Sequence, residues 1–266
     1  MPRTFPGRRA AVAILTTALL MPFATACGSD DDKGDGDATK GGESSRTELT
    51  VLAAASLTDV FKTAGQAYED THAGTTVKFS FAGSQELAAQ VRQGIDADAL
   101  VTADTRTMDG LRSDTGSPTV IARNRLVIAV REGNPEKIDD LADLADRKLK
   151  VVLAAPEVPA GRYSEQILDK RDLDVRPVSE EPNVRAVLTK VALGEADAGL
   201  VYATDAAAEP GKVDAVTVPD DQNAIASYPA ATLEESSHAA AAAEFVTWLS
   251  GPEAQRILRD AGFQKP

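Results

Sequence analysis

From Glu48 to the C-terminus, short apolar runs of strand length alternate with amphipathic segments of helix length. Strands separated by helix-sized segments are typical of βαβ units, in which a helix connects neighbouring parallel strands. The pattern therefore predicts an α/β fold built on mainly parallel sheets. The predicted strands are Leu49–Ala53, Val77–Phe81, Ala99–Ala103, Leu126–Val130 and Lys150–Ala154, and predicted helices include Leu57–Tyr68, Gln85–Gln93 and a C-terminal helix from Ala239 to Ala261 that is broken at Gly251-Pro252.

The first 47 residues predict an export signal and a spacer. Three arginines precede an apolar run over residues 10–21, which is too short for a comfortable membrane span and is followed by small residues before Cys27. This pattern predicts a lipoprotein signal peptide over 1–26, with Cys27 as the lipid-modified N-terminus. An ordinary secretory signal that leaves Cys27 as a free thiol is the alternative. Residues 27–47 are rich in Gly, Ser, Asp and Lys and predict a flexible tether, which places the body at the outer face of the cell membrane.

Charge and composition exclude several classes of function. The chain has a net charge of −13, and loss of the three N-terminal arginines would make the mature protein more acidic still. An acidic body repels nucleic acid, so no nucleic-acid partner is expected. The single cysteine excludes an intramolecular disulfide, and His72 and His238 are too far apart for zinc-ligand spacing. We interpret both histidines as solvated surface residues.

Four turns at predicted strand ends carry groups that suit an anion. Ser56 and Ser84 stand at expected helix N-caps, Pro159-Ala160-Gly161 leads into another helix, and Asn183-Val184 opens a helix that runs to Leu193. Ligands of open α/β sheets bind beyond the carboxyl ends of the strands, where free amides at helix starts attract negative charge. Each turn alone is explained by ordinary capping or turn formation. The set of four favours an anion site made of uncharged donors.

The order and spacing of these turns, together with other segments, resemble the periplasmic molybdate-binding proteins of bacterial ABC importers. The resemblance covers nearly everything from residue 49 onward. The segments that carry it are Val51–Thr58, Phe81–Ser84 with Leu87-Ala88, Ala97-Asp98, Thr102–Asp104, Asn124–Val127, Val158–Tyr163, Asn183–Arg185 and Gly194–Asp205.

This resemblance implies a two-lobe periplasmic-binding-protein fold of type II that closes over molybdate or tungstate. It implies one lobe made of residues 48–122 and 226–266 and a second made of 123–225. The implied ligands are the Ser56 and Ser84 hydroxyls, the Ala160 and Val184 amides and the Tyr202 hydroxyl. Molybdenum would be bound as its oxyanion, without direct metal ligands or a cofactor, by a monomer that delivers it to a membrane permease.

Two features depart from the family pattern. The second turn carries Ser84 alone, where the family often has two or three serines. The acidic pair Glu180-Glu181 beside the fourth turn serves no anion site, and solvent exposure is the simplest interpretation of it.

Alternative functions remain open from the sequence. Another tetrahedral oxyanion, such as sulfate, would use the same neutral donors. Phosphate is disfavoured because its protonated form needs an acceptor, although Asp59 and Asp205 lie near the site in sequence. A serine hydrolase is disfavoured because the chain has neither Gly-x-Ser-x-Gly nor Ser-x-x-Lys, so no enzymatic activity is expected. A purely structural lipoprotein would not need four such turns.

Overall fold

The computed structural model describes residues 46–266. The predicted signal peptide, Cys27 and most of the predicted tether lie outside the described residues. The end of the predicted tether is wrong by one residue, because Thr47 already belongs to the first strand and pairs with Thr75.

A nine-stranded sheet runs through the described part of the chain, in the order β2-β1-β3-β9-β4-β7-β5-β6, with β8 paired to β4. All five predicted strands are confirmed. The strands are β1 (Thr47–Ala54), β2 (Thr75–Ala82), β3 (Ala99–Val101), β4 (Thr119–Arg131), β5 (Val151–Ala154), β6 (Ser179–Glu181), β7 (Ala198–Tyr202), β8 (Val213–Thr217) and β9 (Ile225–Thr232).

The predicted α/β class is confirmed, although the sheet is mixed and not mainly parallel. β1 is parallel to β2 and β3, and β5 is parallel to β6 and β7. β9 is antiparallel to β3 and β4, and β4 is antiparallel to β7 and β8. Each of these antiparallel pairs includes β4 or β9. The prediction also found only half of β4, since Arg123, Asn124 and Arg125 hide the apolar pattern of its first half.

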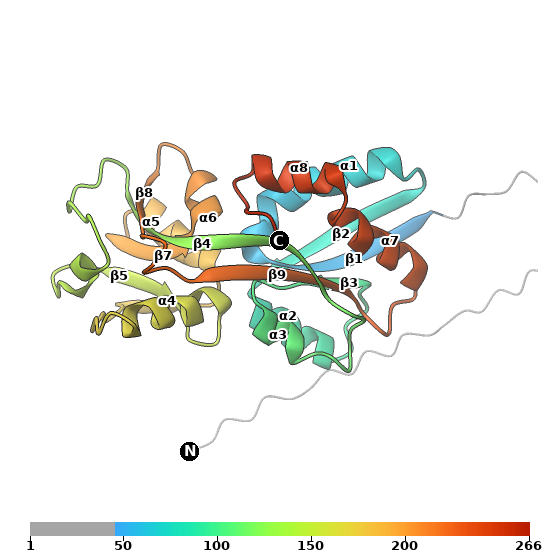
Figure 1. Ribbon diagram of the computed structural model, residues 1–266, viewed down its shortest axis with the longest axis horizontal. Coiled ribbons are helices and arrows are strands. Elements are labelled where there is room, and N and C mark those ends of the chain that lie inside the picture. Colours follow the sequence, from blue (N-terminus) through green and yellow to red (C-terminus); the bar gives the residue numbers. More distant parts are fainter. Residues whose placement is uncertain (1–45) are drawn as a thin grey trace, which may run out of the picture. The chain divides into compact units, whose positions relative to one another are not determined.

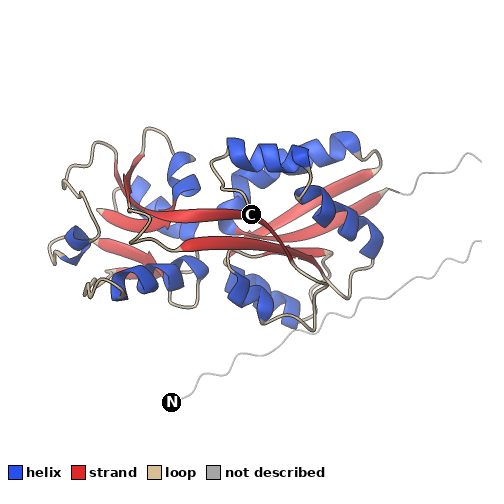
Figure 2. Cartoon of the chain, in the orientation of Figure 1, coloured by secondary structure: helices blue, strands red, loops and turns tan. Residues whose placement is uncertain are grey.

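Helices cover both faces of this sheet (Figures 1 and 2). The helices are α1 (Thr58–Thr71), α2 (Ser84–Arg92), α3 (Thr105–Asp109), α4 (Pro159–Asp169), α5 (Val184–Ala192), α6 (Ala203–Ala207), α7 (Ala239–Leu249) and α8 (Pro252–Asp260), with 3₁₀ turns η1 (Ala55–Leu57) and η2 (Ala142–Ala145). The predicted break of the C-terminal helix is confirmed, because α8 starts at Pro252 after Gly251 as its N-cap.

The elements form two groups joined by two long strands. The first group consists of β1–β3 with α1–α3, α7 and α8, and the second consists of β5–β8 with α4–α6 (Figure 1). β4 pairs with β9 through Arg125 and with β7 from Leu126 onward, so a single strand belongs to the sheets of both groups. A β-bulge between Val120 and Ala122 interrupts the β4–β9 ladder.

An aromatic cluster packs α1 and α7 of the first group against each other. The Tyr68 ring is fully buried and makes edge contacts with Phe245 and Trp248, at centroid distances of 5.0 and 5.3 Å. His72 is not the freely solvated residue we predicted, because it stacks on Tyr68 at 3.8 Å. His238 is largely exposed and its Nδ1 lies 3.2 Å from an oxygen of Asp98.

Two further properties of residues 46–266 bear on function. None of their helices combines the length and apolar character that a membrane crossing needs. Within the same range, no three His, Cys, Asp or Glu side chains gather in a way that could hold a metal ion.

Candidate functional site

The four turns that the sequence singled out meet at one cavity between the two groups of elements. The cavity has an empty volume of about 210 Å³. Every residue that lines it is uncharged, and the five predicted ligands are all among them. The lining residues are Ala54, Ala55, Ser56, Ala82, Gly83, Ser84, Ala103, Val158, Pro159, Ala160, Asn183, Val184 and Tyr202.

Ser56 reaches the cavity from a different local structure than we predicted. It lies inside η1 and does not cap a helix, since the N-cap of α1 is Leu57. The chain makes a 3₁₀ turn on leaving β1, which frees the serine side chain from the helix start. Its Oγ lies 3.0 Å from the hydroxyl of Tyr228, which is 172 residues away.

Ser84 is likewise not the N-cap of α2, because Gly83 takes that position and Ser84 is the first helical residue. The Ser84 side chain is buried, and its Oγ accepts a hydrogen bond of 3.0 Å from the backbone N–H of Ala103. That bond uses an acceptor site of the oxygen, so the hydroxyl proton stays available to a ligand.

Two helix starts reach the cavity from the second group. Helix α4 begins with Val158 as N-cap and Pro159 in its first turn, which places Ala160 where a backbone N–H has no partner within the helix. Helix α5 begins at Val184, and the Asn183 side chain caps it by accepting a hydrogen bond of 3.0 Å from the Ala186 N–H. The predicted helix start at Asn183 is thus confirmed.

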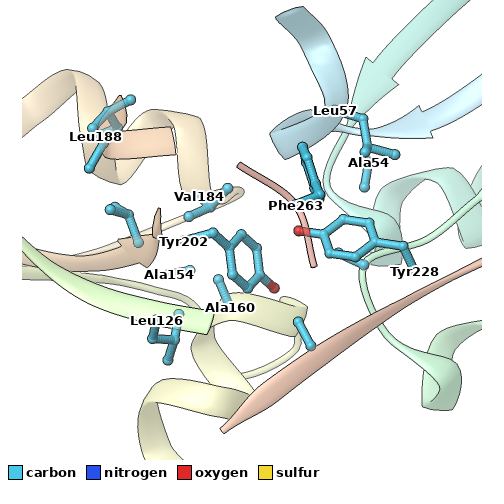
Figure 3. Close-up of a cluster of buried hydrophobic side chains, with 14 of the residues drawn as sticks. Ala54, Leu57, Leu126, Ala154, Ala160, Val184, Leu188, Tyr202, Tyr228 and Phe263 are labelled. Atoms are coloured by element: carbon cyan, nitrogen blue, oxygen red, sulfur yellow. The ribbon is translucent and has the colours of Figure 1, made fainter. Parts of the chain in front are cut away.

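Tyr202 completes the lining from the end of β7. Its side chain is buried, and its hydroxyl has no hydrogen-bond partner among the described residues. Burial is the main reason that the pKa of Tyr202 is raised well above its usual value, so the phenol keeps its proton. Figure 3 shows the Tyr202 ring between the two groups, near Ala160 and Val184. A buried phenol without a partner is a donor left free for a ligand.

The acidic residues near the site in sequence do not line the cavity. Arg185 lies between them, with its Nη1 2.8 Å from Asp59 and its Nε 2.7 Å from the fully buried Asp205. Burial, opposed by the Arg185 charge, raises the pKa of Asp205 to about 6. Asp205 also accepts a hydrogen bond of 3.2 Å from the Tyr202 N–H.

The interpretation of Glu180-Glu181 as a solvent-facing pair is wrong for one member. Glu180 is exposed, but Glu181 is buried and lies 2.8 Å from the ammonium of Lys190. The ion pair links β6 to α5, and Glu181 is not among the residues that line the cavity.

Sequence reasoning missed Tyr228 and Arg185. Tyr228 lies on β9 behind Ser56, and its ring centroid is 6.0 Å from that of Tyr202. No local pattern distinguishes such residues, because their partners lie far away along the chain.

Comparisons with known proteins agree with this architecture. A family described as "Bacterial extracellular solute-binding protein" matches residues 49–264. The molybdate-binding protein ModA of Mycobacterium tuberculosis is 40% identical over 256 residues, covering 95% of this chain and 97% of the relative.

Solved structures show the same fold at lower identity. The periplasmic molybdate-binding protein of Azotobacter vinelandii matches with a TM-score of 0.71 and 22% identity, over 82% of this chain and 99% of that one. The sulfate-binding protein SubI from Mycobacterium tuberculosis matches with a TM-score of 0.74 and 20% identity, over 82% of this chain and 87% of that one. The fold is therefore that of a periplasmic binding protein. On the family match and the identity to ModA, the chain belongs to the bacterial extracellular solute-binding proteins.

Proposed function

We propose that this protein captures molybdate or tungstate outside the cytoplasmic membrane and delivers it to an ABC importer. The observation that carries the proposal is the cavity, where hydroxyl and amide donors meet without a charged side chain. Such donors satisfy a fully deprotonated oxyanion and offer no carboxylate acceptor to a protonated one. The name of the 40% identical relative, a molybdate-binding protein, supports the choice of ion.

The proposed ligand set is the hydroxyls of Ser56, Ser84 and Tyr202 and the amides of Ala160 and Val184. Amides at helix starts carry partial positive charge, which favours an anion even in an acidic protein. Uncharged donors also avoid an unpaired buried cation when the site is empty. The molybdenum atom itself would contact no protein group, and no cofactor takes part.

The ligand set divides between two lobes that we propose to close over the ion. The lobes are residues 48–122 with 226–266, and residues 123–225. They correspond to the two groups of elements, and both crossings lie within or at the start of the long strands β4 and β9. Two contacts between the lobes support a closed arrangement. Gln85 Nε2 donates a hydrogen bond of 2.8 Å to the carbonyl oxygen of Pro182, and Arg162 forms an ion pair with Asp104.

The proposed location follows from the N-terminal sequence. Lipidation at Cys27 would hold the protein at the outer face of the cell membrane, with residues up to Arg46 as the tether. A membrane permease would then accept the ion from a monomeric, non-enzymatic carrier. Cell fractionation with metabolic fatty-acid labelling, compared between wild type and Cys27→Ala, tests the anchor.

Titration calorimetry with molybdate, tungstate, sulfate and phosphate tests the proposed ion directly. We expect heat with molybdate and tungstate and none with phosphate. Heat with sulfate alone would mean that the protein binds sulfate and not molybdate. No heat with any of the four ions would contradict the transport function.

Removing single hydroxyl donors is expected to weaken binding without unfolding the protein. A hydrogen bond to a charged group contributes about 1.5–3 kcal/mol, so Ser84→Ala and Tyr202→Phe should each raise the molybdate Kd by about tenfold to a hundredfold. Calorimetry measures the change, with Ser113→Ala and Tyr68→Phe as matched controls away from the cavity. Unchanged affinity in both cavity variants would exclude the proposed ligand set.

Gly83 offers a test of closure that leaves the donors in place. A Cβ at Gly83 would lie 2.5 Å from the end of the Gln85 side chain, which can turn away, and 2.6 Å from the backbone carbonyl oxygen of Pro182, which belongs to the other proposed lobe. Its φ of −61° suits alanine, so Gly83→Ala should fold normally and resist only the closed arrangement. We expect at least about tenfold weaker molybdate binding. The melting temperature without ion should match wild type.

Gly110→Ala is the control for this experiment, since the nearest atom to its Cβ is the mobile guanidinium of Arg92 at 3.2 Å. Wild-type affinity in Gly83→Ala would contradict closure of these two lobes.

A further inference from the structure

Tyr228 lies directly behind one of the proposed ligands and does not itself line the cavity. It is fully buried on β9, the strand that runs between the two groups of elements. Its ring makes edge contacts with Tyr202 at 6.0 Å and with Phe263 at 5.5 Å, and Figure 3 shows it beside both. These contacts fix the position of the phenol.

The Tyr228 hydroxyl is the only hydrogen-bond partner of the Ser56 side chain among residues 46–266. A serine hydroxyl has one proton and two acceptor sites, so it can turn its proton toward the cavity or away from it. A neighbour that donates to the serine oxygen removes this ambiguity, because the serine proton must then point elsewhere.

Ser84 shows the same arrangement with a backbone donor. The Ala103 N–H donates to Ser84 Oγ, and an N–H cannot reverse its role. Within residues 46–266, no backbone N–H donates to Ser56 Oγ in this way, and the Tyr228 hydroxyl takes the corresponding position. Burial, the largest cause, raises the pKa of Tyr228 above its ordinary value, so the phenol stays protonated.

We propose that Tyr228 is a positioning residue, whose hydroxyl donates to Ser56 Oγ and thereby directs the Ser56 proton to the bound oxyanion. This inference rests on the proposed function, since it needs an anion in the cavity. It assigns the selectivity for fully deprotonated ions to an oriented pair of serine donors. Without Tyr228, the Ser56 hydroxyl could turn and accept a hydrogen bond from a protonated ion such as hydrogen phosphate.

A double-mutant cycle separates this role from simple packing. We expect Tyr228→Phe to raise the molybdate Kd by about threefold to tenfold in the wild-type background. In the Ser56→Ala background the same change should have almost no further effect, because the hydroxyl it positions is gone. In the Ser84→Ala background the two losses should multiply.

The ratio of molybdate to phosphate affinity gives a second readout. It should fall in Tyr228→Phe and stay at the wild-type value in Tyr68→Phe, which removes a buried phenol elsewhere. Replacement of Tyr228 by 4-aminophenylalanine keeps the ring and an N–H donor, and should restore molybdate affinity to within about threefold of wild type.

Each other outcome overturns the inference. Wild-type affinity in Tyr228→Phe would mean that the hydroxyl has no role, and equal losses in the two serine backgrounds would mean that Tyr228 acts through packing alone. Should Tyr228→Phe fail to fold, poor binding by the folded 4-aminophenylalanine variant would also contradict it. Failure of wild type to bind any oxyanion would refute the proposed function instead, so the two failures are distinguishable.

Discussion

Gly161→Ala is expected to raise the molybdate Kd by about a hundredfold. Gly161 lies in the first turn of α4, pressed against the end of β5. A Cβ there would overlap the carbonyl oxygen of Ala155 and lie 2.5 Å from that of Ala154. The Ala155 carbonyl cannot move freely, because it accepts the Val158 N–H at 2.9 Å. The helix must therefore move, and it carries the Ala160 amide with it.

The expected displacement is roughly 1 Å, and a shift of this size at a binding group costs about two orders of magnitude. Overpacking should also lower the free energy of unfolding by about 1–3 kcal/mol. Calorimetry and urea denaturation measure the two effects, with Gly110→Ala as the control. Full affinity would mean that the position of the α4 start does not determine the site.

Asp205→Asn is expected to change how stability depends on pH. The pKa of Asp205 rises from an ordinary value of 3.8 to about 6 because the carboxyl is buried. The folded protein then holds the proton more tightly than the unfolded chain, so this residue's contribution to stability is greatest below pH 4. The contribution is lost as the pH rises from about 4 to about 6, by on the order of 3 kcal/mol.

The measurement is the difference in free energy of unfolding between wild type and Asp205→Asn, taken by urea denaturation from pH 4 to pH 7. Other carboxylates affect both proteins alike, so the difference isolates Asp205. Wild type should lose stability relative to the variant as the pH rises through this window. A difference that is constant with pH, or of opposite sign, would contradict the raised pKa.

The sequence predicts much of the fold because strands and helices follow from local periodicity. The five predicted strands and the helix break at Gly251-Pro252 could be predicted from residues that are neighbours in the sequence. The mixed character of the sheet could not be predicted this way, since the direction of β9 against β3 and β4 depends on the path of the whole chain. Of the polar residues in the first half of β4, only Asn124 is buried, and its side chain donates a hydrogen bond to Thr204, which lies 80 residues away in the sequence.

The candidate site, like the fold, could be predicted only in part from the sequence. The resemblance to molybdate-binding proteins placed all five predicted ligands, and the structure brings them to one cavity. The capping roles of Ser56 and Ser84 were wrong because a difference of one residue in a helix start lies within the normal error of sequence patterns. Tyr228, Arg185 and the buried Glu181 became visible only through contacts between distant segments.

The two strands that join the halves of the molecule affect how reproducibly the binding groups can return to the same positions. β4 and β9 connect them through a hydrogen-bonded ladder, whose register is fixed by its pairing. A ladder can bend or twist, but sliding would require several bonds to break together. A protein that takes up and releases an ion many times must return its donors to the same places within about half an ångström. That reproducibility would come from the sheet, while the turns supply only the chemistry.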